Sequence, residues 1–466
     1  MEAVLMCFPL IIGFIYGEDT YLGFVIPIAC LAAIGLPAFI FPPKDKTIYA
    51  REGFVIVAFA WLLMSLAGAL PFVITKVIPS YVDAFFETVS GFTTTGASVV
   101  ADVEIMPKSL LFWRSFTHWV GGMGVLVLVL AILPDYNAGV MHIFRAESPG
   151  PTVGKLVSKI KFTARILYGI FIVLTVVEII FLVCGKMPFF DAVVLSFGTA
   201  GTGGFSITNN SIAYYDSTYF EMVIAVFMFL FGINFNFFYL ILTGNVLGAF
   251  KIEEVRTYFI IVVIATLAIA VNIISVYGNF GQALRYAFFQ VSSVSTTTGY
   301  ATTDFNLWPS FSKTVLLALM MIGACAGSTG GGLKVARLII LLKSAFAGVK
   351  KMARPRTVTS LRFEGETVSD SVLGTVKTFF ILFIGWIIIS TLLISIEGYG
   401  DIETNLSATI ACFNNIGPGL GLVGPMGNYG GYSDFSKIIL SINMLAGRLE
   451  IFPVMILFSP STWKRH

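Results

Sequence analysis

Charge, histidine and cysteine are all scarce in this sequence. Only 12% of its 466 residues are Asp, Glu, Lys or Arg, about half the share of a soluble domain. The three histidines form no His-Glu-x-x-His pair, and no Gly-x-Ser-x-Gly motif lies in an apolar run. The five cysteines suggest no disulfide framework, and a net charge of +3 is too small to indicate nucleic-acid binding. We therefore expect neither an enzyme nor a nucleic-acid-binding protein, and no organic cofactor.

Apolar residues and glycine are abundant instead. Apolar side chains make up 57% of the chain, which also has 45 Gly and 44 Phe, a composition typical of membrane proteins. Only Met1 and Glu2 precede the first apolar run, so we expect a retained helix there and not a cleaved signal peptide. We expect an all-α membrane protein with about ten spanning helices, near residues 3–17, 22–42, 53–75, 110–134, 166–185, 218–245, 257–277, 312–346, 371–396 and 436–460.

Basic residues are unevenly divided between the segments that connect these runs. Most of the 29 Lys and Arg residues fall on one side of the predicted membrane, which marks that side as cytoplasmic and places both termini there. The opposite side is acidic, and an acidic mouth would concentrate cations. The basic segments are 43–52, 135–165, 246–256, 334–370 and 464–466.

A short Thr/Gly segment recurs between the predicted spans. In three copies a Gly follows an Ala by twelve positions, and a fourth, looser copy has Asn in place of Thr. Irregular backbone at membrane depth is tolerated only where protein or water surrounds it. Four Thr/Gly strips around one axis would offer carbonyl oxygens to a dehydrated monovalent cation. The copies end at Gly96, Gly204, Gly299 and Gly417.

Two further features interrupt apolar runs. The tract Gly323–Gly332 is followed by Leu333, so it lacks the Gly-Lys-Ser/Thr end of a nucleotide-binding loop. It is either an unwound stretch of helix crossing a pore or a set of glycines that permits tight helix packing. Arg448 lies inside the last run and needs a partner or a wet cavity, so a pore role and simple structural pairing both stay open.

Several long motifs occur in a fixed order: 90–97, 118–124, 131–134, 145–147, 203–206, 323–332, 414–421 and 447–450. On these motifs the chain resembles the TrkH-type subunits of bacterial potassium uptake systems, within the Trk/Ktr/HKT superfamily of cation transporters. The resemblance covers almost the whole chain. It implies four helix/re-entrant loop/helix repeats around one central pore, preceded by an N-terminal helix pair.

The resemblance also implies residue roles. The potassium selectivity filter would consist of Thr94, Thr95, Gly96, Thr202, Gly203, Gly204, Thr297, Thr298, Gly299, Asn415, Ile416 and Gly417. An intramembrane gate would consist of Gly323, Gly327, Gly330, Gly331, Gly332 and Arg448. Glycine at position 96, where some plant relatives have Ser, favours potassium over sodium.

Domain organisation, location and partners follow from the same resemblance. We expect a helix pair at 1–42 and pore repeats at 43–142, 143–252, 253–360 and 361–466. The resemblance implies a bacterial inner (plasma) membrane protein, a homodimer, and regulation by a cytosolic TrkA-type nucleotide-binding subunit. A proton- or sodium-coupled carrier with alternating access stays open, although parallel repeats with an even number of spans disfavour it.

Overall fold

The computed structural model describes residues 1–41, 50–122, 124, 160–355, 360–458 and 460, and these are mostly helical. The predicted all-α class is confirmed. Several predictions lie outside the described residues: the end of the run near 110–134, the motifs 131–134 and 145–147, the basic segment 464–466, and most of the basic segments 43–52 and 135–165.

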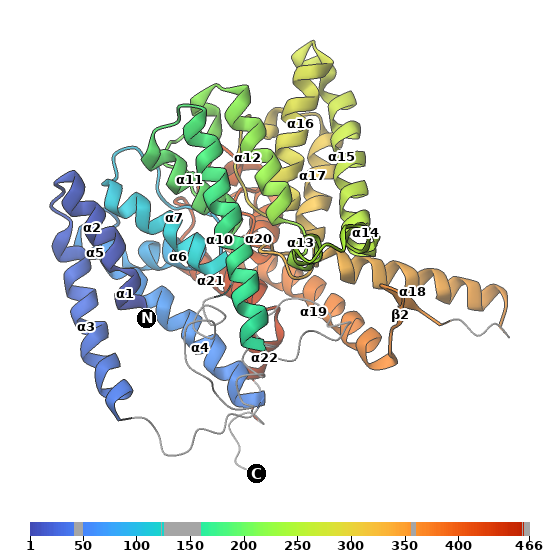
Figure 1. Ribbon diagram of the computed structural model, residues 1–466, viewed down its shortest axis with the longest axis horizontal. Coiled ribbons are helices and arrows are strands. Elements are labelled where there is room, and N and C mark those ends of the chain that lie inside the picture. The colour runs from blue at the N-terminus through green and yellow to red at the C-terminus, as the bar shows by residue number, and fades with distance from the viewer. Residues whose placement is uncertain (42–49, 123, 125–159, 356–359, 459, 461–466) are drawn as a thin grey trace.

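The helices form an N-terminal group and four successive groups (Figure 1). The N-terminal group contains α1 (Glu2–Leu5), α2 (Cys7–Tyr16) and α3 (Tyr21–Ile40). The first group contains α4 (Ala50–Gly68), α5 (Leu70–Ile74), α6 (Tyr81–Phe92) and α7 (Lys108–Gly122). The second contains α10 (Ile160–Cys184), α11 (Phe189–Gly201), η1 (Ser211–Tyr215), α12 (Thr218–Phe231), α13 (Phe235–Leu242) and α14 (Val246–Lys251).

The third group contains α15 (Glu253–Tyr277), α16 (Phe280–Ser295), η2 (Phe305–Leu307), α17 (Ser310–Ile322) and α18 (Val335–Ala353). A small antiparallel hairpin follows, formed by β1 (Arg362–Phe363) and β2 (Glu366–Thr367). The fourth group contains α19 (Asp370–Ser395), α20 (Ile402–Phe413), η3 (Gly421–Val423), α21 (Asp434–Arg448) and α22 (Phe452–Phe458).

A long apolar helix opens each of the four groups. Within the described residues, the helices long and apolar enough to cross a membrane are Glu52–Ile74, Arg165–Cys184, Glu253–Tyr277 and Asp370–Ser395. The bent pair of α12 and α13 would be a fifth. The count of about ten spans therefore stays a prediction.

The later apolar runs of these groups are interrupted rather than continuous. The axes of α12 and α13 differ by 90°, α17 and α18 flank the Gly323–Gly332 tract, and α21 ends at Arg448 before α22 begins. In the last break Glu450 and Ile451 have φ of +58° and +64°, which an α-helix cannot contain. The expected runs at 218–245, 312–346 and 436–460 are thus each broken in two.

Polar side chains define where the short helices begin. Ser80, Asn279 and Asp401 accept backbone N–H groups at the first turns of α6, α16 and α20. Hydrogen bonds from Thr404 lower the pKa of the Asp401 carboxyl. At the N-terminus of α7, the Glu18 carboxylate accepts from the backbone of Lys108, so the N-terminal group is tied to the first group.

Candidate functional site

The four short helices α6, α11, α16 and α20 end in the same backbone turn. In each turn one residue donates its N–H to the carbonyl three residues back, at 3.0–3.3 Å, and the next donates to the carbonyl five residues back, at 2.8–2.9 Å. This pair of bonds is the Schellman motif that ends many helices. The donor pairs are Thr94 and Thr95, Thr202 and Gly203, Thr297 and Thr298, and Asn415 and Ile416.

The first donor of each turn has a left-handed backbone although none is glycine. Threonine is rare in this region because its branched Cβ crowds the backbone. The four Thr/Gly strips are therefore not in an extended conformation throughout. The φ angles are +57° at Thr94, +53° at Thr202, +62° at Thr297 and +56° at Asn415.

The glycines that follow pack the four turns into a closed ring, which we call the glycine ring. Each has a positive φ, from +72° to +94°. A Cβ added to Gly96 would lie 1.9 Å from the carbonyl oxygen of Gly203, in the next turn along the chain. The same holds for Gly204 against Thr298 at 2.0 Å, Gly299 against Ile416 at 2.1 Å, and Gly417 against Thr95 at 2.7 Å. The turns therefore neighbour one another in chain order, and the fourth meets the first.

A side-chain bond joins the fourth turn to the first. The Asn415 amide donates to the Thr95 hydroxyl at 2.9 Å and to the carbonyl of Met444 at 2.9 Å. Threonine hydroxyls bond within the first and third turns instead, at 2.8 Å from Thr93 to Thr95 and at 2.8 Å from Thr296 to Thr298. The Asn that departs from the Thr pattern in the sequence thus makes a bond between turns.

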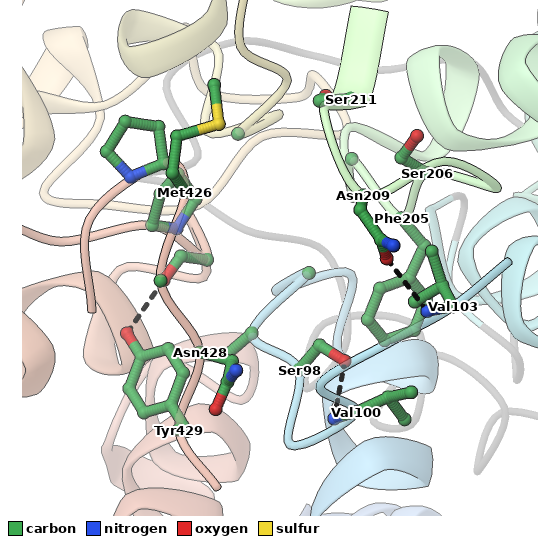
Figure 2. Close-up of a pocket in the computed structure, with 18 of the residues that line it drawn as sticks. Ser98, Val100, Val103, Phe205, Ser206, Asn209, Ser211, Met426, Asn428 and Tyr429 are labelled. Atoms are coloured by element: carbon green, nitrogen blue, oxygen red, sulfur yellow. Dashed lines mark hydrogen bonds between the residues drawn. The ribbon is translucent and has the colours of Figure 1, made fainter. Parts of the chain in front are cut away.

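All four ring glycines line one cavity of about 230 Å³. Figure 2 shows its wall, to which loops of the first, second and fourth groups contribute. Hydrogen bonds hold these loops: the Tyr429 hydroxyl donates to the carbonyl of Gly417 at 2.7 Å, and the backbone of Val103 donates to the Asn209 side chain at 2.9 Å. The ring carbonyls therefore adjoin a polar cavity.

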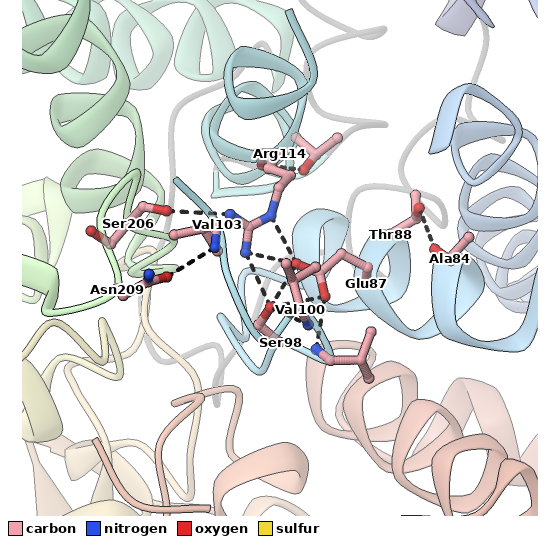
Figure 3. A network of polar contacts seen from close by, with 11 residues as sticks. Ala84, Glu87, Thr88, Ser98, Val100, Val103, Arg114, Ser206 and Asn209 are labelled. Atoms are coloured by element: carbon pink, nitrogen blue, oxygen red, sulfur yellow. Dashed lines mark hydrogen bonds and ion pairs between the residues drawn. The ribbon is translucent and has the colours of Figure 1, made fainter. Parts of the chain in front are cut away.

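A buried ion pair supports the backbone that leaves the first ring turn (Figure 3). Arg114 of α7 pairs with Glu87 of α6 at 2.7 Å, and the two side chains are 2% and 0% exposed. Glu87 also accepts from the backbone of Val99, and Arg114 donates to the carbonyl of Ser206 at 3.2 Å. The pair thus ties the segment after Gly96 to the segment after Gly204.

Removing one member of this pair should destabilise the protein. We expect Arg114→Ala to cost about 3–5 kcal/mol, because it leaves the Glu87 carboxylate buried without its cation. Lys313→Ala is the matched control, since its pair with Glu403 is more exposed, at 23% and 44%, and should cost less than about 1 kcal/mol. The melting temperatures of both variants are measured by thermal unfolding in detergent. Equal melting temperatures would contradict a stabilising role of the Arg114–Glu87 pair.

The Gly323–Gly332 tract lies against the ring turns. The backbone of Gly331 donates to the Thr297 hydroxyl at 2.8 Å, and a Cβ on Gly331 would lie 2.2 Å from the carbonyl oxygen of Asn414. A Cβ on Gly330 would lie 2.8 Å from the carbonyl oxygen of Thr296. The tract is not helical, so its glycines serve close packing against the turns and not packing between two regular helices.

The other tract glycines shape the tract itself. Gly323, Gly327 and Gly332 have φ of +73°, +71° and +82°. Gly323 packs on the backbone of Gly331 and Gly332, and the carbonyl of Gly327 accepts from the backbone of Phe235 at 3.1 Å. The tract therefore also contacts the break between α12 and α13.

Arg448, the last residue of α21, joins the tract to the end of α7. It donates to the carbonyl of Thr329 in the tract at 2.9 Å and to that of Gly122 at 2.8 Å. Its contact with the Thr94 hydroxyl is longer, at 3.4 Å. Glu450 pairs instead with Arg337 of α18. The structure thus brings Arg448, the tract and the first ring turn together.

Sequence reasoning missed Arg114 and the buried Glu254, which accepts hydrogen bonds from the tract. Arg114 lies in an apolar run, and the scarcity of charge in such runs could have singled it out. Glu254 gave no such signal, because it stands among the charged residues at the start of α15.

Comparison with known proteins gives matches along nearly the full chain. The family model TrkH, described as a cation transport protein, matches residues 24–465. The Trk system potassium uptake protein TrkH of Escherichia coli (strain K12) is 37% identical, over 98% of this chain and 96% of its own length. The protein of the same name from Halomonas elongata is 33% identical, over 100% of this chain and 97% of its own length.

A solved structure has the same fold. The crystal structure of the potassium transporter TrkH from Vibrio parahaemolyticus superimposes with a TM-score of 0.88 at 33% sequence identity, covering 99% of this chain and 96% of that one. Such transporters are membrane proteins and not a class of enzymes. The resemblance seen in the motifs is therefore confirmed, and the chain belongs to the TrkH family of cation transport proteins.

Proposed function

We propose that the protein takes up potassium ions through the glycine ring, which acts as a selectivity filter. The observation that carries the proposal is the closure of four turns with the same backbone hydrogen bonds into one ring whose carbonyl oxygens lie beside a polar cavity. Carbonyl oxygens replace the water shell of a dehydrated monovalent cation. The names of the E. coli and V. parahaemolyticus relatives support potassium as the transported ion.

The coordinating groups in this proposal are backbone atoms. They belong to the residues expected from the sequence: Thr94, Thr95 and Gly96, Thr202, Gly203 and Gly204, Thr297, Thr298 and Gly299, and Asn415, Ile416 and Gly417. The fourth turn differs in its side chains, and Asn415 makes a bond between turns that Thr202 and Thr297 do not. The filter is fourfold in its backbone and asymmetric in its side chains.

The Gly323–Gly332 tract and Arg448 form the gate in this proposal. Glycines admit more than one backbone conformation, so the tract can leave the underside of the ring without breaking a helix. A guanidinium at this position opposes a cation that has passed the filter, because like charges repel. The contacts of Arg448 with Thr329 and of Gly331 with Thr297 support a closed state.

Orientation and partners are part of the same proposal. Lys343, Lys350 and Lys351 of α18 fit the cytoplasmic side of a bacterial inner membrane, with both chain termini on that side. A cytosolic TrkA-type nucleotide-binding subunit and a second copy of the chain are the proposed partners. The repeats 43–142, 143–252, 253–360 and 361–466 each contain one ring turn, which supports them as the units of the pore.

Uptake of rubidium and sodium into liposomes that contain the purified chain tests the proposal. We expect these liposomes to take up rubidium. Potassium should inhibit the uptake strongly and sodium only weakly. Liposomes that contain the Gly204→Val variant are the inactive control. An imposed proton gradient distinguishes a channel-like mechanism from a proton-coupled carrier. Only the carrier would accumulate rubidium against the electrochemical gradient of rubidium. Absence of any cation flux with correctly inserted protein would refute the proposed function.

A further inference from the structure

Glu254, in the first turn of α15, reaches into the tract with a buried carboxylate. Its side chain is 2% exposed. One carboxylate oxygen, Oε1, accepts from the backbone N–H of Ala326 at 2.6 Å and from that of Ala336 at 3.0 Å. The other, Oε2, accepts from the Asn234 side chain at 3.3 Å. Glu254, which lies outside the tract, therefore binds both the first part of the tract and the helix that follows the tract.

These contacts fix the ends of the loop that carries the tract. Ala326 lies before the glycines that touch the ring, and Ala336 lies in the first turn of α18, after them. Hydrogen bonds to a carboxylate are about twice as strong as neutral ones, and the N-terminus of α18 favours a negative charge. Through Asn234 the same carboxylate also contacts the break between α12 and α13.

The β1–β2 hairpin is attached to the turn of helix that carries Glu254. Glu364, in the hairpin turn, accepts from the backbone N–H of Glu253 at 3.1 Å and from that of Glu254 at 3.0 Å. It therefore caps α15. Lys343 of α18 pairs with Glu253 and donates to the carbonyl of Arg362 at 2.9 Å. A displacement of the hairpin would thus move the first turn of α15.

We propose that Glu254 is a positioning residue that holds the tract against the ring, and that the β1–β2 hairpin controls it through Glu364. The inference rests on the proposed role of the tract as a gate. In the proposed orientation the hairpin lies on the cytoplasmic side, so a protein bound to that face can pull on α15 and release the tract. The path consists of two carboxylates and the backbone between them.

Cys325 offers a readout of the gate that does not depend on transport. Its thiol is buried within the tract. In a protein with the other four cysteines replaced by Ala, a small water-soluble thiol reagent should modify Cys325 only when the tract moves. The rate of modification and the rate of rubidium uptake into liposomes are measured on the same full-length variants.

Four variants separate the contacts. Glu254→Ala should raise both rates about tenfold, the change that accompanies the loss of one strong hydrogen bond. Glu254→Gln should have a smaller effect, since its amide oxygen still accepts from the backbone. Glu364→Ala should act in the same direction, because it removes the cap of α15. Glu366→Ala, on an exposed residue of the same hairpin, should change neither rate.

A variant with Gly330 and Gly331 deleted distinguishes the two levels of the proposal. If this deletion leaves rubidium uptake unchanged, the tract is not the gate, and the part of the proposed function that assigns gating to the tract is wrong. If the deletion raises uptake while Glu254→Gln and Glu364→Ala leave both rates at the control level, the inference about Glu254 is wrong. Should Glu254→Ala not yield monodisperse protein, the Gln and Glu364 variants decide.

Discussion

Gly204→Ala should lower rubidium uptake at least tenfold and reduce the preference for potassium over sodium. The new Cβ would lie 2.0 Å from the carbonyl oxygen of Thr298, and this backbone atom cannot move aside as the end of a flexible side chain can. The position also has φ of +72°, which costs a residue with a Cβ about 1–2 kcal/mol. The Thr298 carbonyl must therefore turn away from its place in the ring.

The ring predicts an order among its four glycines. The distance from an added Cβ to the nearest carbonyl oxygen of the neighbouring turn is 1.9, 2.0 and 2.1 Å at Gly96, Gly204 and Gly299, and 2.7 Å at Gly417. Alanine should therefore be least harmful at Gly417. The matched control is Gly385→Ala in α19, where among the described residues no atom outside the helix's own backbone lies within 4 Å of the added Cβ and φ is ordinary. Equal uptake and equal sodium inhibition in Gly204→Ala and Gly385→Ala would contradict the filter assignment.

Arg448→Ala should raise cation flux about tenfold or more. A unit positive charge at roughly 6 Å opposes a cation by about 2–3 kcal/mol at an effective dielectric constant of ~20. The substitution removes that barrier and also frees the carbonyl of Thr329 in the tract from its hydrogen bond. The first change lowers the barrier to the cation and the second favours an open tract, so the two effects should add.

Arg448→Lys separates charge from hydrogen bonding. A lysine keeps the positive charge but is a point donor and cannot reproduce the planar contacts with Gly122 and Thr329. We expect its flux to lie between those of the native protein and Arg448→Ala. Flux is measured in liposomes at matched protein content, with Lys313→Ala as the control. Unchanged flux in Arg448→Ala, at normal assembly, would exclude this residue from the proposed gate.

The ring glycines could be predicted from the sequence because the pattern that marks them is local. Gly96, Gly204 and Gly299 stand at one spacing from a preceding Ala, and each falls between two apolar runs. The left-handed backbone at Thr94 had no such signal, since threonine disfavours it and only the hydrogen bonds of the folded turn maintain it. The order of the turns likewise depends on contacts between residues about one hundred positions apart and, where the fourth turn meets the first, 320 positions apart.

The contacts of the tract were even less accessible to sequence reasoning. Glu254 binds the backbone N–H groups of Ala326 and Ala336, and backbone donors are the same at every non-proline residue. No side-chain pattern therefore marks the pair. The break between α21 and α22 depends in the same way on positive φ at Glu450 and Ile451, two residues that carry no turn preference.

The bond between Asn415 and Thr95 has a consequence for biosynthesis. The two residues are 320 positions apart, and a chain is synthesised from its N-terminus, with early segments folding first. The ring therefore cannot close around the first three turns until the last quarter of the chain has been inserted into the membrane. A product that terminates before residue 415 has an open seam beside Thr95, which leaves polar backbone facing lipid or another protein.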